Sequence, residues 1–149
     1  MADVFLKRFS WIALIKKKDT DVMKFLLSIR NWNLFYFINK SKNNAWPDIE
    51  EFLDEVAETT GLDRECLAQS PVKIHRFYLE TFARTEGQMG HYHLKLADFF
   101  LPETKLAELK ESDTLRWFAR QDIDRKKTHD GKPIVEAVSN YLDILGYTD

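Results

Sequence analysis

The sequence predicts an all-α fold, arranged as a single compact domain over residues 1–149 with about six to eight short helices. Two observations favour this fold class. Apolar side chains recur three and four residues apart in most segments, as they do on the buried face of a helix. Proline and glycine number only 4 and 5, and most of them stand at the ends of these segments.

Composition places the chain among globular proteins. Hydrophobic residues make up 44% of the chain and charged residues 31%, a balance that excludes intrinsic disorder. The formal net charge of −2 provides no general attraction for nucleic acid or anionic lipid. Cys66 is the only cysteine, which excludes an intrachain disulfide framework and a cysteine zinc site. We therefore expect the cytoplasm, or the interior of a host cell, as the location.

The N-terminal segment, residues 1–18, is expected to form an amphipathic helix docked on its own domain. Phe5, Phe9 and Ile12 fall at helical spacing. The lysines at 16–18 stand on the wrong side of the apolar stretch for a secretory signal. No apolar run approaches the ~20 residues that span a bilayer, so no membrane span is expected.

Residues 21–39 are predicted to form one long helix or two abutting helices. Val22, Phe25 and Ile29 lie on one helical face, behind acidic and threonine residues that can cap the first turn. Two asparagines near the middle of the segment are the point at which it would divide.

The clearest helix is "WPDIEEFLDEVAETTG", residues 46–61. Phe52 and Val56 line one face, Pro47 suits the first helical position, and Gly61 can close the end in a left-handed turn. A short helix over residues 64–69 is expected to follow.

Pro71 is expected to begin another helix, which ends near Gly87 and carries an aromatic stripe at Phe77 and Tyr78. Residues 91–96 alternate between polar and apolar side chains, as in a strand. Because no second convincing strand is available to pair with it, the sequence allows at most one short extended segment here.

Three further helices complete the prediction. Pro102 begins a short one, Ser112 caps the next, and Pro133 opens the last, which Gly146 ends.

No catalytic residue, metal site or cofactor is predicted, because phosphate-loop, nucleophile-elbow, HExxH and CxxC spacings are all absent from the sequence. An enzyme is therefore less expected than a non-enzyme. One alternative remains open: a metal-dependent hydrolase with His and Asp ligands. It requires the histidines to converge with carboxylates in a pocket, and the four histidines are His75, His91, His93 and His129.

A second alternative is a nucleic-acid-binding helical module. The basic clusters at 16–18 and 125–127 would have to meet on one exposed surface. Nucleic acid is the less expected partner, because each cluster is more typical of a solvated helix end.

The run Leu34-Phe35-Tyr36-Phe37-Ile38 has no polar interruption, and aromatic residues make up 13% of the chain. On a helix such a run points around the whole circumference, which one small domain rarely covers. The sequence therefore predicts that part of this surface meets another protein chain or a second copy.

The predicted function follows from that surface. We expect a non-catalytic protein-interaction protein, such as a small subunit, adaptor, inhibitor or assembly factor of a multiprotein complex. The residues predicted to anchor the interface are aromatic: Trp32, Phe35, Tyr36, Trp46, Trp117 and Tyr147.

Overall fold

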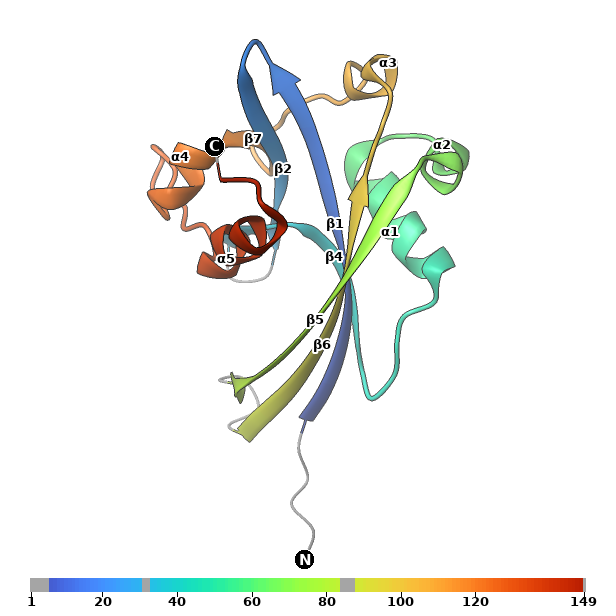
Figure 1. Cartoon of the computed structure of the whole chain (residues 1–149), viewed down its shortest axis with the longest axis vertical. Coiled ribbons are helices and arrows are strands. Elements are labelled where there is room, and N and C mark those ends of the chain that lie inside the picture. Colours follow the sequence, from blue (N-terminus) through green and yellow to red (C-terminus); the bar gives the residue numbers. More distant parts are fainter. Residues whose placement is uncertain (1–5, 31–32, 84–87, 149) are drawn as a thin grey trace, which may run out of the picture.

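The fold is mixed α/β and is built on a seven-stranded sheet, as a computed structural model that describes residues 6–30, 33–83 and 88–148 shows (Figure 1). The strand order is β3-β2-β1-β6-β5, with β4 paired to β1 and β7 paired to β2. In chain order the elements are β1 (Leu6–Asp19), β2 (Val22–Arg30), β3 (Leu34–Tyr36), β4 (Ile38–Asn43), α1 (Ile49–Thr60), α2 (Arg64–Gln69), β5 (Val72–Ala83), β6 (Gln88–Phe99), α3 (Glu103–Leu106), β7 (Leu115–Ala119), α4 (Arg120–Asp124) and α5 (Glu136–Leu145).

The all-α prediction is therefore wrong, and burial of the strands on two faces is the reason. The segment predicted as a helix over 21–39 contains β2, β3 and the start of β4. In β2, Phe25 and Leu27 belong to one core cluster, whereas Leu26 belongs to a second cluster on the opposite side. A strand buried on both sides has no polar alternation, so its apolar run imitates that of a buried helix.

The same error applies at three other places. The expected N-terminal helix is β1, the expected helix after Pro71 is β5, and the helix expected from Ser112 is β7 followed by α4. The extended segment near 91–96 is real and longer than predicted, because it lies in β6. Its partner is β5, in an antiparallel ladder that runs from the Val72–Phe99 pair to the Ala83–Gln88 pair.

Four helices are confirmed as the sequence indicated, among them α3, which begins directly after Pro102. α1 ends at Gly61 with φ 76°, and α5 ends at Gly146 with φ 87°. Both glycines adopt the left-handed conformation that closes a helix without steric cost. α2 begins after Asp63, whose side chain accepts a hydrogen bond from the backbone N–H of Glu65 at 3.2 Å.

The helices cover opposite faces of the sheet, with α1 and α2 on one side and α4 and α5 on the other (Figure 1). The side that contacts α1, called here the α1 face, carries Ala13 and Ile15 of β1. The other side, the α5 face, carries Ile12 and Leu14. All four β1 side chains are buried, so this strand contributes alternately to two cores.

A buried ion pair joins β1 to β6 near the C-terminus. Lys16 forms an ion pair with Asp98, whose side chain is only 3% exposed. The Nζ atom of Lys16 also donates a hydrogen bond to the carbonyl oxygen of Phe99 at 3.1 Å. The Tyr147 hydroxyl donates to Oδ2 of Asp98 at 2.7 Å. These bonds satisfy a carboxylate that would otherwise be costly to bury.

Within the described part of the chain, no helix is long and apolar enough to cross a membrane. The cytoplasmic location and the single-domain organisation stay predictions.

Replacing Asp98 by Leu should lower the free energy of unfolding by about 3–5 kcal/mol, because it leaves the Lys16 ammonium buried without its counter-charge. Urea denaturation at neutral pH measures the change. The double variant Lys16→Met/Asp98→Leu should recover most of the loss, whereas Asp19→Leu, which breaks the exposed pair with Lys24, should change little. Equal effects of Asp98→Leu and Asp19→Leu would contradict the assigned role of the pair.

Tyr147 should make the protein more sensitive to alkali. Burial, and then the hydrogen bond to Asp98, raise the pKa of Tyr147 well above its ordinary range. The folded state therefore holds this proton more tightly than the unfolded chain does. The stabilisation is complete below about pH 10, the unfolded value, and is lost as the pH rises further. Between about pH 8 and about pH 11, the urea midpoint of the wild type should fall more than that of Tyr147→Phe; parallel curves would exclude this contribution.

Candidate functional site

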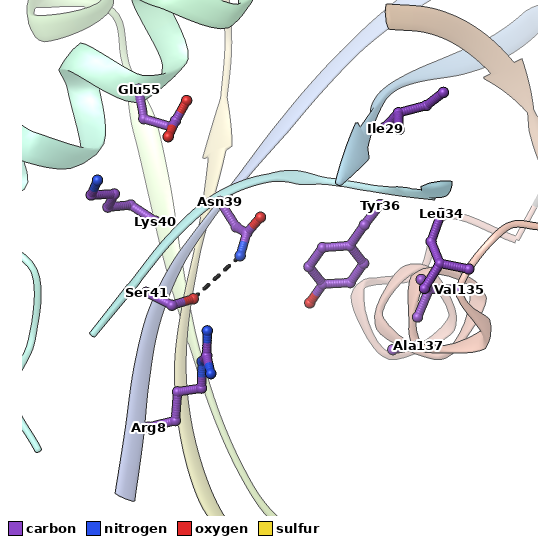
Figure 2. A pocket seen from close by; sticks show the side chains of 10 residues that line it. All are labelled: Arg8, Ile29, Leu34, Tyr36, Asn39, Lys40, Ser41, Glu55, Val135 and Ala137. Atoms are coloured by element: carbon purple, nitrogen blue, oxygen red, sulfur yellow. Dashed lines mark hydrogen bonds between the residues drawn. The ribbon is translucent and has the colours of Figure 1, made fainter. Parts of the chain in front are cut away.

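A cavity of about 740 Å³ lies where β4 meets the start of α5 (Figure 2). Its size is typical of sites for small molecules and cofactors. The lining residues come from four strands and two helices or their leading segments: Arg8, Ile29, Leu34, Tyr36, Asn39, Lys40, Ser41, Glu55, Val135 and Ala137.

Pairing of β1 with β4 brings polar side chains of both strands together along one side of this cavity. In the antiparallel register Ser10 lies opposite Ser41, and their hydroxyls are 2.5 Å apart. Asn39 donates from Nδ2 to the Ser41 hydroxyl at 3.2 Å. Arg8 lies two residues before Ser10 on β1, and alternate residues share a face, so its guanidinium reaches the same cavity (Figure 2).

Helix α1 contributes the acidic side chain of the cavity. Glu55 is half-buried beside the stripe of α1 that Phe52 and Val56 anchor in the core, and it lines the cavity towards β4. Oε2 of Glu55 accepts a hydrogen bond from Thr59 at 3.1 Å. Lys40 lies beneath Glu55 on β4 (Figure 2).

Tyr36 forms a wall of the cavity at the end of β3 (Figure 2). Burial raises the pKa of the Tyr36 hydroxyl well above its ordinary range, and the neighbouring Tyr141 adds to the shift. The hydroxyl is therefore a neutral hydrogen-bonding group at physiological pH.

A second hollow of about 220 Å³ adjoins the first on the α5 face. The two share four lining residues: Arg8, Tyr36, Asn39 and Ser41. Tyr92 and Leu79 line its far end. The two hollows form one cleft, with a polar centre between an aromatic end and an apolar end.

The charge of the cleft favours an anionic ligand. Arg8 and Lys40 carry two positive charges, and neither forms an ion pair with any residue within 6–30, 33–83 or 88–148. Glu55 is the one acidic residue in the lining. Partly enclosed cations without counter-charges bind phosphate or carboxylate groups strongly. The cleft is therefore suited to a phosphorylated molecule with a flat ring system.

The residues predicted to anchor an interface lie in different surroundings. Phe35 is fully buried and packs edge-on against Phe118 at 5.0 Å between ring centroids. Tyr36 lines the cleft, Tyr147 binds Asp98, and Trp32 lies outside the described residues.

The other two predicted anchors are half-buried tryptophans. Trp46 packs on Phe9 at 5.0 Å between ring centroids, and Trp117 lies under the Lys17 ammonium at 4.6 Å. The structure does not gather the six residues into one patch, and the interface itself stays a prediction.

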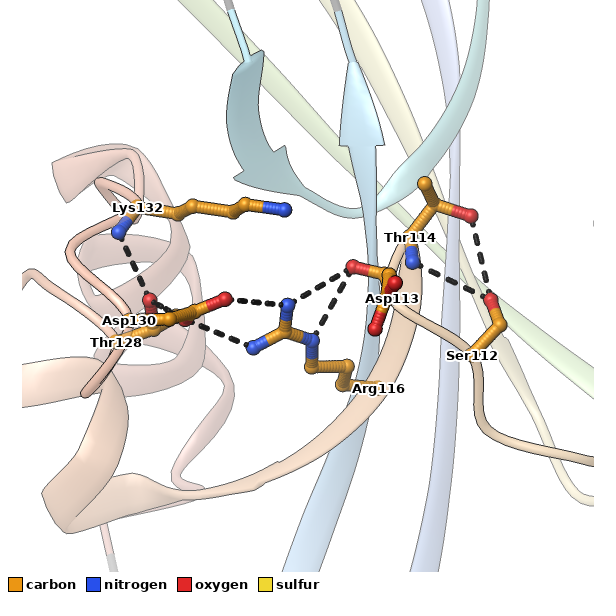
Figure 3. A network of polar contacts seen from close by, with 7 residues as sticks. All are labelled: Ser112, Asp113, Thr114, Arg116, Thr128, Asp130 and Lys132. Atoms are coloured by element: carbon orange, nitrogen blue, oxygen red, sulfur yellow. Dashed lines mark hydrogen bonds and ion pairs between the residues drawn. The ribbon is translucent and has the colours of Figure 1, made fainter.

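The His and Asp ligands of a metal-dependent hydrolase are not brought together. Among the described residues, no three His, Cys, Asp or Glu side chains form a group that could hold a metal ion. His91 contacts Tyr78, and the Asp130 carboxylate is held by other partners (Figure 3). Arg116 donates to it at 3.0 and 2.9 Å, and Thr128 donates to it as well.

The basic clusters do not form the surface that a nucleic-acid-binding helical module needs. Lys16 is bound to Asp98, and Lys17 covers a tryptophan ring. Arg125 and Lys126 pair with Asp122 and Glu136 respectively. Neither cluster lies on a helix that presents it outward as the module would require.

No protein-family model matches the sequence, and no curated protein matches it. Solved structures match the fold. The Ap4A hydrolase of C. elegans is 14% identical with a TM-score of 0.58, over 97% of this chain and 98% of that one. The E. coli ORF135 protein is 15% identical with a TM-score of 0.56, over 96% and 91% of the two chains. The NUDIX domain of Shewanella oneidensis NrtR, in complex with ADP ribose, is 14% identical with a TM-score of 0.51, over 99% and 86%.

This likeness shows a Nudix-type fold and overturns two expectations drawn from the sequence. The fold is shared with a hydrolase, so the expectation of a non-catalytic adaptor, inhibitor or assembly factor is contradicted. The expectation of a non-enzyme falls with it. Sequence reasoning also missed the cleft residues Arg8, Asn39 and Ser41, whose common location depends on pairing between β1 and β4.

Proposed function

We propose that the chain hydrolyses a phosphoanhydride bond in a nucleoside-containing substrate bound in the cleft. The single observation that carries the proposal is the convergence of Arg8, Lys40 and Glu55 around one cavity walled by Tyr36. Such a set can bind phosphates, hold a water molecule and contact a base.

The substrate class is supported by the named neighbours. Ap4A and ADP ribose both contain adenosine joined to a second group through a chain of phosphates. The cleft offers a matching sequence of environments. Its polar centre suits the phosphates, and the tyrosine and apolar ends suit a base or a sugar.

The chemistry assigned to each residue follows from its charge. Water attacks a phosphorus atom, a new P–O bond forms, and the bond to the bridging oxygen breaks. Glu55 orients the water and accepts its proton. Arg8 and Lys40 neutralise the charge that develops on the phosphate oxygens and on the leaving phosphate.

A resident metal does not fit the described residues, since they contain no group of three potential ligands. In phosphoryl-transfer sites Mg²⁺ is held mainly by substrate phosphates together with one or two carboxylates. Magnesium would therefore arrive here with the substrate, as its magnesium salt.

The wild-type protein should release nucleoside phosphates from at least one member of a panel of Ap4A, ADP ribose and nucleoside triphosphates, all supplied as magnesium salts. Separation of the products by ion-exchange chromatography measures the reaction. A protein that neither hydrolyses nor binds any of these compounds in calorimetric titrations would refute the proposal.

Glu55→Gln should lower kcat by about 10²-fold or more while leaving KM nearly unchanged, because the amide fills the same space but cannot accept a proton. The matched control is Glu65→Gln on α2, which removes a carboxylate outside the cleft. If both variants keep wild-type kcat, Glu55 is not the base.

Arg8→Ala should raise KM by about tenfold or more, since it removes a charge-assisted hydrogen bond to phosphate. Lys7→Ala serves as the control, because Lys7 is the preceding residue on β1 and points to the opposite face. Substrate-saturation curves measure both variants, and an equal KM for the two would exclude phosphate binding by Arg8.

A further inference from the structure

The long strands continue beyond the helices. Figure 1 shows the lower parts of β1, β6 and β5 extending past α1 and α5, so no helix covers the α1 face there. Six side chains define this uncovered region, called here the aromatic–cationic face: Phe9, Trp46, Arg76, Tyr78, His93 and Lys95.

Strand register aligns three of its rings in a row across the sheet. Phe9 pairs with His93, and His93 pairs with Tyr78. The Phe9 and His93 rings are stacked at 4.7 Å with 10° between their planes, and His93 and Tyr78 lie 4.9 Å apart. Trp46 extends the row on the other side of Phe9, at 5.0 Å.

This row is not covered by the rest of the described chain. Tyr78 is 53% exposed, and Phe9, Trp46 and His93 are only half-buried. Tyr78 also lies on β5, the last strand of the sheet order, so one side of the row is open. Exposed, stacked rings of this kind are typical of binding surfaces rather than of a core.

A row of positive charge runs beside the rings, two residues further along each strand. Arg76 lies directly opposite Lys95 in the β5–β6 ladder. The Lys95 ammonium lies 4.2 Å from the centre of the Trp46 ring and 4.9 Å from that of Trp11. Neither Arg76 nor Lys95 forms an ion pair with another described residue.

Like charges directly opposite in a sheet are destabilising. The Arg76–Lys95 pair therefore has an energetic cost, of which the contacts of Lys95 with Trp11 and Trp46 offset a part. A bound anion would remove that cost, and the adjacent rings indicate what accompanies the anion.

We propose that the aromatic–cationic face binds single-stranded nucleic acid, with a base stacked on the exposed Tyr78 ring at the open end of the row and phosphates held by Arg76 and Lys95. Flat exposed rings interleaved with cations are the two features that non-specific single-strand binding requires. The rows are about 7 Å apart, the length of two strand residues, so a base on one row and its phosphate on the other are within reach of each other.

This surface shares no residue with the lining of the cleft. Arg8 points to the α5 face and lines the cleft, whereas Phe9 points to the α1 face and joins the aromatic row. Binding at this face is therefore independent of the proposed hydrolysis. It also differs from a helical module, since strands supply all the binding groups except Trp46.

Fluorescence anisotropy with a labelled oligothymidine of about 12 nucleotides tests the proposal, with an oligouridine and a duplex of the same length for comparison. The wild type should bind both single strands more tightly than the duplex, whose bases are not free to stack. Tyr78→Ala should raise Kd by about tenfold, and Tyr78→Phe should restore binding because it keeps the ring.

Arg76→Gln/Lys95→Gln should weaken binding and reduce the slope of log K against log salt by about 1.4, the value for two phosphate contacts in a single strand. Matched controls are Phe100→Ala, an exposed ring outside the face, and Lys105→Gln/Lys110→Gln, two cations outside it. Circular dichroism and thermal unfolding establish that each variant is folded.

Three results would overturn the proposal. The first is a wild type that binds no single strand, and the second is a duplex that binds as tightly as single strands. The third is an equal loss of binding in face variants and controls. Sedimentation of the protein alone addresses the other possible occupant: if Tyr78→Ala dissociates a dimer and no oligonucleotide binds, the face joins two copies of the chain.

Discussion

Strand β1 is the constraint on which the rest of the structure depends. It hydrogen-bonds to β6 along one edge, and along the other edge to β4 through residues 8–13 and to β2 through residues 16–19. No partner on that second edge spans the whole strand, so β2 and β4 diverge from each other between the two stretches. The cleft lies beside this divergence, where β3 turns into β4 and the start of α5 approaches. A cavity at this place is a consequence of one strand being shared by two partners.

The alternation of side chains along β1 then gives each face its own chemistry. In the middle of the strand, both faces are apolar and are covered by helices, and four consecutive buried residues over 12–15 hold the two cores together. Towards the N-terminus the same alternation places Arg8 and Ser10 on one side and Phe9 and Trp11 on the other. Arg8 and the aromatic row thus lie on opposite sides of the sheet, whereas Lys40 and Glu55 of the cleft lie on the α1 side, at the β4 edge. Rigidity supplied by the core supports both.

The helices could be predicted because their signals are local. α1 and α5 each show one apolar stripe and a terminal glycine, and both signals lie within a single segment of sequence. The strands could not, because β1 and β2 are buried on both faces and because the rings near Phe77 and Tyr78 satisfy helical and strand spacing alike. The cleft is harder still: Glu55 lies on a predicted helix, but Arg8 and Asn39 meet it only through a pairing that no local pattern reports. The net charge of −2 argued against a nucleic-acid partner, but a total charge does not report local clusters. The β5–β6 register places the cations Arg76 and Lys95 directly opposite each other.

The parallel pairing of β1 with β6 has a consequence for synthesis on the ribosome. Leu6 pairs with Gly90 and Ile15 with Phe99. Strand β1 therefore cannot pair with β6 until more than half of the chain has been synthesised after it. Pairing across so long a separation is slow, because loop-closure entropy opposes it until the contacts form. During that interval the apolar β1–β2 hairpin has an unpaired edge, which is the state most prone to aggregation. This topology therefore favours assistance by chaperones during translation.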